Sequence, residues 1–182
     1  RSVIPHRRRI GVLYDEEHSG TFIRDAHRAA KQQGLELVAV AIRGQDDIPQ
    51  AVRGLLPTID ALWLIQDQTV ISESAIPFYL ESTLDAKVPL FTFSSTLVQQ
   101  GALGALVMDA WTVGQQAARL AQARLKAPNT ATGSMQAPEQ PQLAVNVSSA
   151  EYFGLSPSPE TMRLAHQRFG GPGAMAQKPG PA

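Results

Sequence analysis

The stretch Ala61-Leu-Trp-Leu-Ile-Gln-Asp-Gln-Thr-Val70 decides the fold: its first five residues are apolar and the next four are polar. A short apolar run that ends in polar residues is typical of a strand buried on both faces, as in a parallel sheet. In open α/β sheets, small molecules bind beyond the carboxyl ends of the strands. Asp67, Gln68 and Thr69 are therefore the first candidates for a binding site, although Asp67 or Thr69 could instead cap the following helix.

The same change from apolar to polar residues recurs along the chain. Strands are predicted at 10–14, 35–42, 61–65, 88–93, 101–108 and 143–147, with helical patterns between them. Ser19 is predicted to cap the first helix, and Ser74 the helix after the central strand. Strands that alternate with helices indicate an α/β fold: a parallel Rossmann-like (flavodoxin-like) sheet with helices on both faces.

The predicted organisation is one domain with short flanking segments, as expected for 182 residues. Residues 1–9 form a basic lead-in or hinge segment, and residues 10–155 form the α/β lobe. Residues 156–169 are predicted to contain a C-terminal helix. Residues 170–182 are rich in glycine and proline, a composition that predicts a disordered tail.

Composition removes several classes of function. Lys plus Arg and Asp plus Glu both number 16, so charge gives no argument for a nucleic-acid partner or an anionic membrane. The chain has no cysteine, which excludes disulfides, thiol catalysis and cysteine-ligated metals. No apolar run approaches the roughly 20 residues needed to span a bilayer, so no membrane insertion is expected. No apolar signal segment follows the arginines near the start.

Signatures of enzymes are missing from the sequence. It contains no dinucleotide fingerprint, no phosphate-binding loop and no nucleophile elbow. His18, near Asp15 and Ser19, could serve acid/base chemistry, but a solvated loop histidine beside a helix cap is the preferred interpretation. An α/β enzyme that uses Asp67 or Asp109 as acid or base remains an alternative. We expect no catalysis, no cofactor and no metal.

Polar and aromatic residues gather at four predicted strand ends. Such residues offer hydroxyls, carboxylates and nearby helix N-termini around one crevice, which suits reversible binding of a small polar or zwitterionic ligand. An aromatic ring could stack on the ligand, although core packing is slightly favoured for Trp111. The candidate ligand-binding residues are Tyr14, Asp15, Ser19, Asp67, Gln68, Thr69, Ser94, Ser95, Asp109 and Trp111.

Several motifs in a fixed order carry a family resemblance. They are Arg9–Tyr14, Gly34–Val38, Asp60–Val70, Val88–Phe91, Leu97–Leu103, Asp109 with Gly114–Ala117, and Leu143–Asn146 with Gly154–Leu155. In this order they resemble the substrate-binding proteins of ABC transporters, in the family that includes tryptophan- and tyrosine-type binding proteins.

The resemblance implies one lobe of a two-lobed, type I periplasmic binding protein that closes on a ligand by a hinge. It implies an ABC transporter permease as partner and a periplasmic or extracytoplasmic location. It places at the cleft Tyr14, Asp15, Asp67, Gln68, Thr69, Ser94, Ser95 and Asp109. Two departures stand out: the family usually has Asp-Asn-Thr at 67–69, and often an acidic pair at 94–95. A serine holds a ligand's ammonium group less strongly than a carboxylate does.

The resemblance also implies that helix 111–127 belongs to a first lobe that would precede Arg9. Its apolar positions, Val113, Ala117, Leu120 and Ala121, lie on one side at helical spacing. We expect self-association through helix 111–126, or docking on a separate first lobe, rather than folding back on the sheet. A small-molecule-sensing or interaction domain of flavodoxin-like shape is the alternative function.

Overall fold

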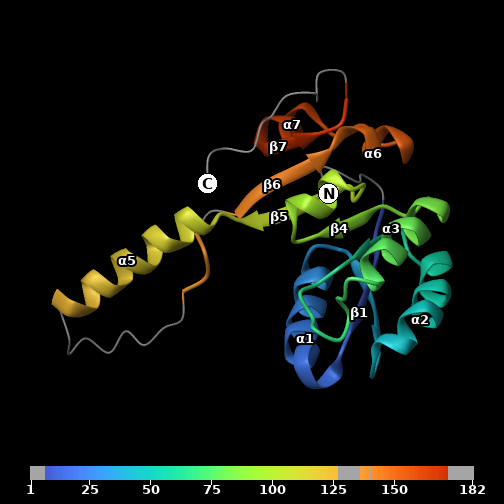
Figure 1. Cartoon of the computed structure of the whole chain (residues 1–182), viewed down its shortest axis with the longest axis horizontal. Helices are drawn as coiled ribbons and strands as arrows, with labels where there is room; N and C mark the ends of the chain where they lie inside the picture. Colours follow the sequence, from blue (N-terminus) through green and yellow to red (C-terminus); the bar gives the residue numbers. More distant parts are fainter. Residues whose placement is uncertain (1–6, 127–135, 140, 172–182) are drawn as a thin grey trace.

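A single mixed sheet forms the centre of the computed structural model, which describes residues 7–126, 136–139 and 141–171 (Figure 1). Its seven strands lie in the order β2-β1-β3-β4-β5-β6-β7. The strands are β1 (Arg9–Tyr14), β2 (Glu36–Ala41), β3 (Ala61–Trp63), β4 (Leu90–Thr92), β5 (Gly104–Met108), β6 (Pro141–Asn146) and β7 (Ala165–Phe169). The helices are α1 (Glu16–Gln32), α2 (Ile48–Leu55), α3 (Ala75–Asp85), α4 (Ser95–Gln99), α5 (Ala110–Lys126), α6 (Val147–Tyr152) and α7 (Pro159–Leu164), with 3-10 turns at Gln45–Asp47 and Leu56–Thr58.

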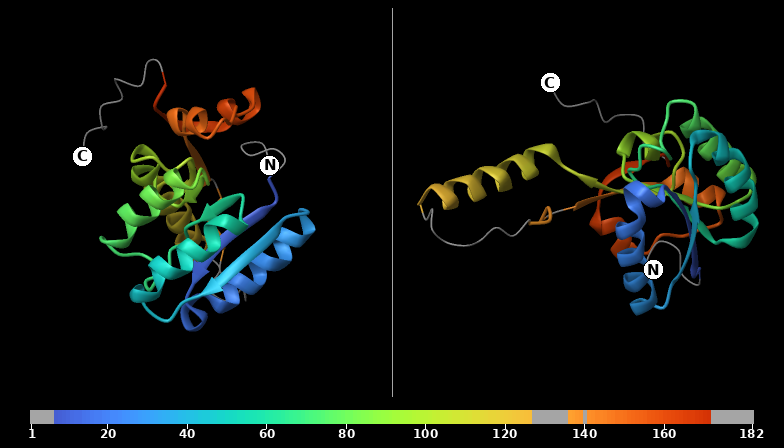
Figure 2. Two further views of the ribbon diagram at one scale, coloured as in Figure 1. Left: turned by 90° about the vertical axis from the view of Figure 1, so that its right-hand side faces the viewer. Right: turned by 90° about the horizontal axis from the view of Figure 1, so that it is seen from below.

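Helices cover both faces of the sheet, as predicted. On one face, Ile23 of α1 packs with Val12 of β1 and Leu37 of β2. On the other, the apolar stripe of α2 packs with Leu62 of β3 and with α3, so that α1 and α2 lie on opposite sides of β1 (Figures 1 and 2). The central strand, β3, is buried on both faces because its successive side chains point alternately into the two layers of helices.

The sheet differs from the predicted all-parallel arrangement at one pair. β1 to β5 are all parallel to one another, whereas β6 runs antiparallel to β5. Met108, the last residue of β5, pairs with Pro141, the first residue of β6. The chain therefore re-enters the sheet at the end where β5 left it, and a strand that re-enters there must run back.

The prediction of a C-terminal helix in residues 156–169 is wrong in its second half. Helix α7 ends at Leu164, and Ala165–Phe169 forms β7, which pairs parallel with β6. Ala165 is buried while His166 and Arg168 are exposed. This alternation with a period of two is the pattern of a strand with one face covered, and β6 supplies the partner that decides it.

The first helix begins earlier than predicted. Asp15, not Ser19, is the N-cap residue of α1, and its carboxylate accepts a hydrogen bond from the N–H of Glu17 at 2.9 Å. Two acidic residues, Glu16 and Glu17, follow in the first turn, where their negative charges interact favourably with the positive end of the helix dipole. Ser19 therefore lies inside the helix, and it is buried.

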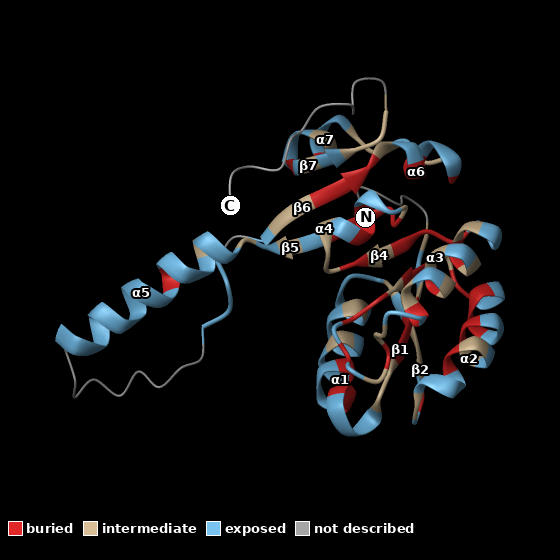
Figure 3. Cartoon of the chain, viewed as in Figure 1, coloured by how far each residue is buried: buried red, intermediate tan, exposed pale blue. Residues whose placement is uncertain are grey.

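Helix α5 extends away from the sheet (Figures 1 and 3). Trp111 is 74% exposed and Leu125 is 83% exposed, so the preference for core packing of Trp111 is wrong. Gln116 is the buried residue of the helix: its amide donates to the carbonyl of Ala137 and accepts from the N–H of Glu139. The helix does not fold back on the sheet, in line with the prediction; which body packs on it stays a prediction.

Parts of the predicted flanking segments lie outside the described residues, namely 1–6 of the lead-in and 172–182 of the tail. Arg9 of the lead-in already belongs to β1. The N–H groups of Arg8 and Arg9 both donate to the carboxylate of Asp60 at 2.8 Å, which ties the start of β1 to the turn before β3. These two bonds lower the pKa of Asp60 below its ordinary value.

Candidate ligand-binding site

The four strand ends singled out in the sequence meet at one edge of the sheet. β1, β3, β4 and β5 are neighbours and run parallel, so their carboxyl ends point the same way. Asp67 and Ser94 follow β3 and β4, so they lie at the same edge of the sheet; that the strand ends share one crevice stays a prediction. That this edge binds a ligand stays a prediction.

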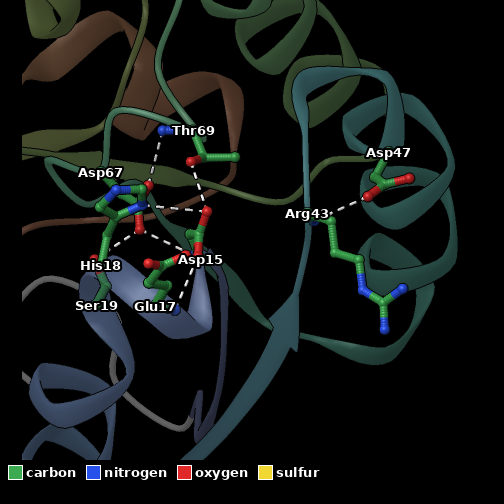
Figure 4. A network of polar contacts seen from close by, with 8 residues as sticks. All are labelled: Asp15, Glu17, His18, Ser19, Arg43, Asp47, Asp67 and Thr69. Carbon is green, nitrogen blue, oxygen red and sulfur yellow. Dashed lines mark hydrogen bonds and ion pairs between the residues drawn. The ribbon is translucent and has the colours of Figure 1, made fainter.

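Asp67 is the hub of the hydrogen bonds at this edge (Figure 4). Its side chain is only 2% exposed. One carboxylate oxygen accepts from the N–H of Asp15 at 2.9 Å and from the hydroxyl of Ser19 at 2.6 Å. The other accepts from the N–H of Thr69 at 2.9 Å. Asp67 therefore joins the loop after β3 to the start of α1, and it does not cap α3, whose first N–H is bonded to Ser72.

Asp15, whose N–H donates to Asp67, is half-buried. Its Oδ2 accepts from the hydroxyl of Thr69 at 2.7 Å and lies 3.2 Å from Nδ1 of His18. The pKa of Asp15 is lowered, first by the hydrogen bond from Thr69, then by the N–H of Glu17, while partial burial opposes the shift. Asp15 is thus held as a carboxylate whose partners fix its position.

His18 is a residue of this network that sequence reasoning set aside. It is exposed, and it reaches Asp15 because the two residues are three apart at the start of α1. The spacing of the two residues in the sequence indicates this pairing once Asp15 is taken as the cap, because residues three apart lie on the same side of a helical turn. The pairing orients His18 over the carboxylate and leaves the rest of its ring open to solvent.

Tyr14 points toward the α1 side of the sheet. Its hydroxyl donates to Glu16 at 2.8 Å, and that bond, followed by burial, raises the pKa of the phenol above its ordinary value. Glu16 also pairs with Arg24 at 3.1 Å. The hydroxyl of Tyr14 is therefore already hydrogen-bonded to Glu16, in the helix that follows β1.

Beyond the ends of β3 and β4 lie three polar side chains that make no hydrogen bond to another side chain or backbone group of the described residues. Gln68 is exposed, and Ser94 and Ser95 are half-buried. Ser94 occupies the N-cap position of α4 without a side-chain cap bond. The hydroxyl of Thr92, at the end of β4, is buried and has no hydrogen-bond partner among the described residues, which is rare for a buried polar group.

Asp109 and Trp111 lie at the end of β5, where α5 begins. The carboxylate of Asp109 accepts from both the N–H and the hydroxyl of Thr112, at 2.8 and 2.7 Å. These bonds lower the pKa of Asp109, so it is charged at neutral pH and engaged as a helix cap. Neither it nor the buried Asp67 is placed as a free acid or base.

A hollow of about 500 Å³ opens at the same edge, at the ends of β1 and β2. Its lining includes Asp15, Glu17 and Arg43 but not Gln68, Thr69 or Ser94. Within residues 7–126, 136–139 and 141–171, no group of three His, Asp or Glu side chains could hold a metal ion. No helix of that part of the chain is long and apolar enough to cross a membrane.

The sheet, its helices on both faces and its polar carboxyl edge form an α/β domain whose fold recurs in solved structures. Residues 1–168 match the family described as ABC transporter substrate binding protein. The chain belongs to this family of substrate-binding proteins.

A curated relative has a similar sequence over part of the chain. The protein named Tyrosine-binding protein from Clostridioides difficile (strain R20291) is 27% identical over 123 residues, which cover 66% of this chain and 35% of the relative. The chain thus matches about a third of that protein's length.

Solved structures share the fold. An ABC domain in complex with L-Trp from Streptococcus pneumoniae superposes with a TM-score of 0.73 at 22% identity, over 92% of this chain and 57% of that one. A conserved domain protein from Vibrio cholerae gives 0.73 at 23% identity, over 92% and 56%. A ligand-free, open substrate binding protein with adhesive properties from Clostridium difficile gives 0.68 at 19% identity, over 91% and 56%.

Proposed function

We propose that the chain is the solute-binding component of an ABC-type importer that holds a small polar organic ligand without catalysis. The ligand lies at the carboxyl ends of β1, β3, β4 and β5 and is handed to a membrane permease from the extracytoplasmic side. The observation that carries the proposal is the polar edge braced by Asp67, in a chain of the substrate-binding family.

The braced loops divide the candidate residues into two groups. Asp67 and Ser19 are buried and bond to each other, so they position the loops and do not meet the ligand. Gln68, Ser94 and Ser95 keep free donors and acceptors at the edge, and Trp111 offers an exposed ring for stacking. We assign ligand contact to the second group, together with the outer face of Asp15 and Thr69.

Aromatic amino acids are the first ligands to test, because the curated relative is named for tyrosine and one structural neighbour holds L-Trp. At 94–95 this chain has two serines, whose hydroxyls are weaker partners for an ammonium group than carboxylates are. A ligand that is polar but uncharged at this end fits the edge equally well, so the panel should include sugars and nucleosides.

The test is native mass spectrometry of ligand carried through purification, followed by titration calorimetry with the identified compound. Gln68→Ala should weaken binding about 5-fold or more, the value of one or two lost hydrogen bonds. Gln50→Ala in α2, also exposed but on a helix away from the edge, is the matched control and should bind as the wild type does. Turnover of any bound compound would overturn the proposal.

A further inference from the structure

Strand β2 is a free edge of the sheet. Only β1 pairs with it among the described strands, over six residues in unbroken register. The N–H group of Glu36 donates to the carbonyl of Arg8, just before β1, and that of Ile42 donates to the carbonyl of Tyr14, the last residue of β1. Hydrogen-bonding groups alternate in direction along a strand, so those of Leu37, Ala39 and Ala41 point outward. The strand contains no lysine, proline or bulge, the devices that normally protect such an edge from pairing with another strand.

Two hollows of opposite charge flank this edge, one at each end of β2. The hollow at the amino end measures about 410 Å³ and is lined by His27, Arg28, Lys31, Leu35 and Leu37, with Glu36 as its one acidic member. The hollow at the carboxyl end measures about 500 Å³ and is lined by Asp15, Glu16, Glu17 and residues 41–43, with Arg43 as its one basic member. The charge pattern follows from α1, whose first turn is acidic and whose last turn is basic.

We propose that β2 pairs antiparallel with β2 of a second copy of this chain, which joins the two sheets into one. The two copies are related by a two-fold axis that runs perpendicular to the sheet, beside the middle of β2. The basic hollow of each copy then lies against the acidic hollow of the other. The two α1 helices then lie side by side and antiparallel on the same face, with Lys31 of each copy facing Glu17 of the other. The contact is self-complementary and closes at two copies.

The direction of pairing follows from the charges. A parallel arrangement would set basic against basic and acidic against acidic hollows, which is destabilising. Lys31 and Glu17 are also free for the contact: in the part of the chain that the structure describes, the side chain of neither one has an ion-pair partner, whereas Arg28 is paired with Asp25. The pairing does not require ligand binding, although Asp15 lines the acidic hollow and is also assigned to ligand contact.

A charge swap tests the pairing by sedimentation velocity over a range of concentrations. The wild-type chain should form dimers, and Lys31→Glu or Glu17→Lys alone should weaken dimerisation about tenfold or more, because both symmetric contacts become repulsive. An equimolar mixture of the two variants should restore a heterodimer, since each of its two contacts again joins opposite charges. A monomeric wild type, or a mixture that associates no better than its components, would overturn the proposal.

A backbone variant tests the strand contact separately. Ala39→Pro removes an N–H that points away from β1, and proline is tolerated at such edge positions. It should therefore abolish dimerisation while keeping the circular dichroism spectrum and melting temperature of the wild type, and Ala39→Ser, which keeps the N–H, should dimerise normally. If Ala39→Pro lowers the melting temperature, the charge swap alone decides. Association that survives the Lys31 and Glu17 changes but is lost in Trp111→Ser would belong to α5 and contradict the proposal.

Discussion

Asp67 shows how burial changes the role of a single carboxylate. Its position beyond a central strand predicted a contact with a ligand. In the structure both of its oxygens serve the chain's own donors, those of Asp15, Ser19 and Thr69. We therefore expect any effect of Asp67 on a ligand to act through the positions of the two loops that it joins.

We expect Asp67→Ala to lower the free energy of unfolding by on the order of 3 kcal/mol, because three donors lose their acceptor in a buried place. Ser19→Ala, which removes one of the three donors, should cost about 1 kcal/mol. Urea denaturation of both variants measures these changes. A stable Asp67→Ala variant with reduced ligand affinity would return Asp67 to the ligand-contact group.

Asp60 predicts a loss of stability in acid. Because its pKa is lowered in the folded state, its contribution is present above the ordinary pKa of about 3.9 and is lost as the pH falls through the lower, folded value. Below pH 4 the wild type should therefore lose stability more steeply than Asp60→Asn, which cannot titrate. Thermal melts of both proteins from pH 6 downward measure the difference, and parallel curves would contradict the prediction.

At the scale of elements, α5 carries an apolar stripe that the described chain leaves uncovered. Val113 and Leu120 are 37% and 38% exposed, beside the much more exposed Trp111 and Leu125. Exposed aliphatic and aromatic side chains forgo about 1.5–3 kcal/mol of burial each. The sequence-based expectation that another body packs on this helix is consistent with that exposure.

Fluorescence can test the exposure of α5 directly, because the chain has two tryptophans. In Trp63→Phe the remaining Trp111 should emit at long wavelength and be quenched readily by acrylamide. In Trp111→Phe the remaining Trp63, half-buried against Phe22 with ring centroids 5.6 Å apart, should be quenched several-fold less. A blue-shifted, protected Trp111 in dilute solution would mean that α5 folds back on its own sheet.

At the scale of the whole molecule, the edge at which ligands are proposed to bind and the β2 edge proposed to pair adjoin at Asp15, which lines the acidic hollow. One is formed by the carboxyl ends of β1, β3, β4 and β5, and the other is the long side of the sheet. The chain covers 57% and 56% of two solved relatives.

Nuclear magnetic resonance can separate these surfaces. We expect L-tryptophan or L-tyrosine at high concentration to shift backbone amide signals of residues 15–19, 66–69, 94–96 and 109–112. Signals of residues 27–37, around the basic hollow, should stay in place because they lie at the amino end of β2. Shifts confined to residues 27–37 would move the binding site to the opposite end of the sheet.

The sequence by itself determined the kind of fold and the edge at which its polar loops meet. Apolar runs of strand length alternate with helical spacing, and this pattern is local, so it can be recognised without knowing what packs on it. The predicted strands correspond to β1 to β6, and their order implied that Asp15, Asp67 and Ser94 would share an edge. The start of α1 was harder to predict, because Asp15 and Ser19 are both residue types that commonly cap helices, and the sequence alone did not show which one does so.

Only the tertiary structure decided which of these groups are free. Asp67 is engaged because Asp15 and Ser19, 52 and 48 residues earlier in the chain, reach it across neighbouring strands. β6 runs antiparallel and β7 is a strand because each pairs with a distant segment, and Trp111 is exposed because α5 leaves the sheet. Burial and strand pairing depend on contacts between segments far apart in the chain, and local sequence patterns do not determine those contacts.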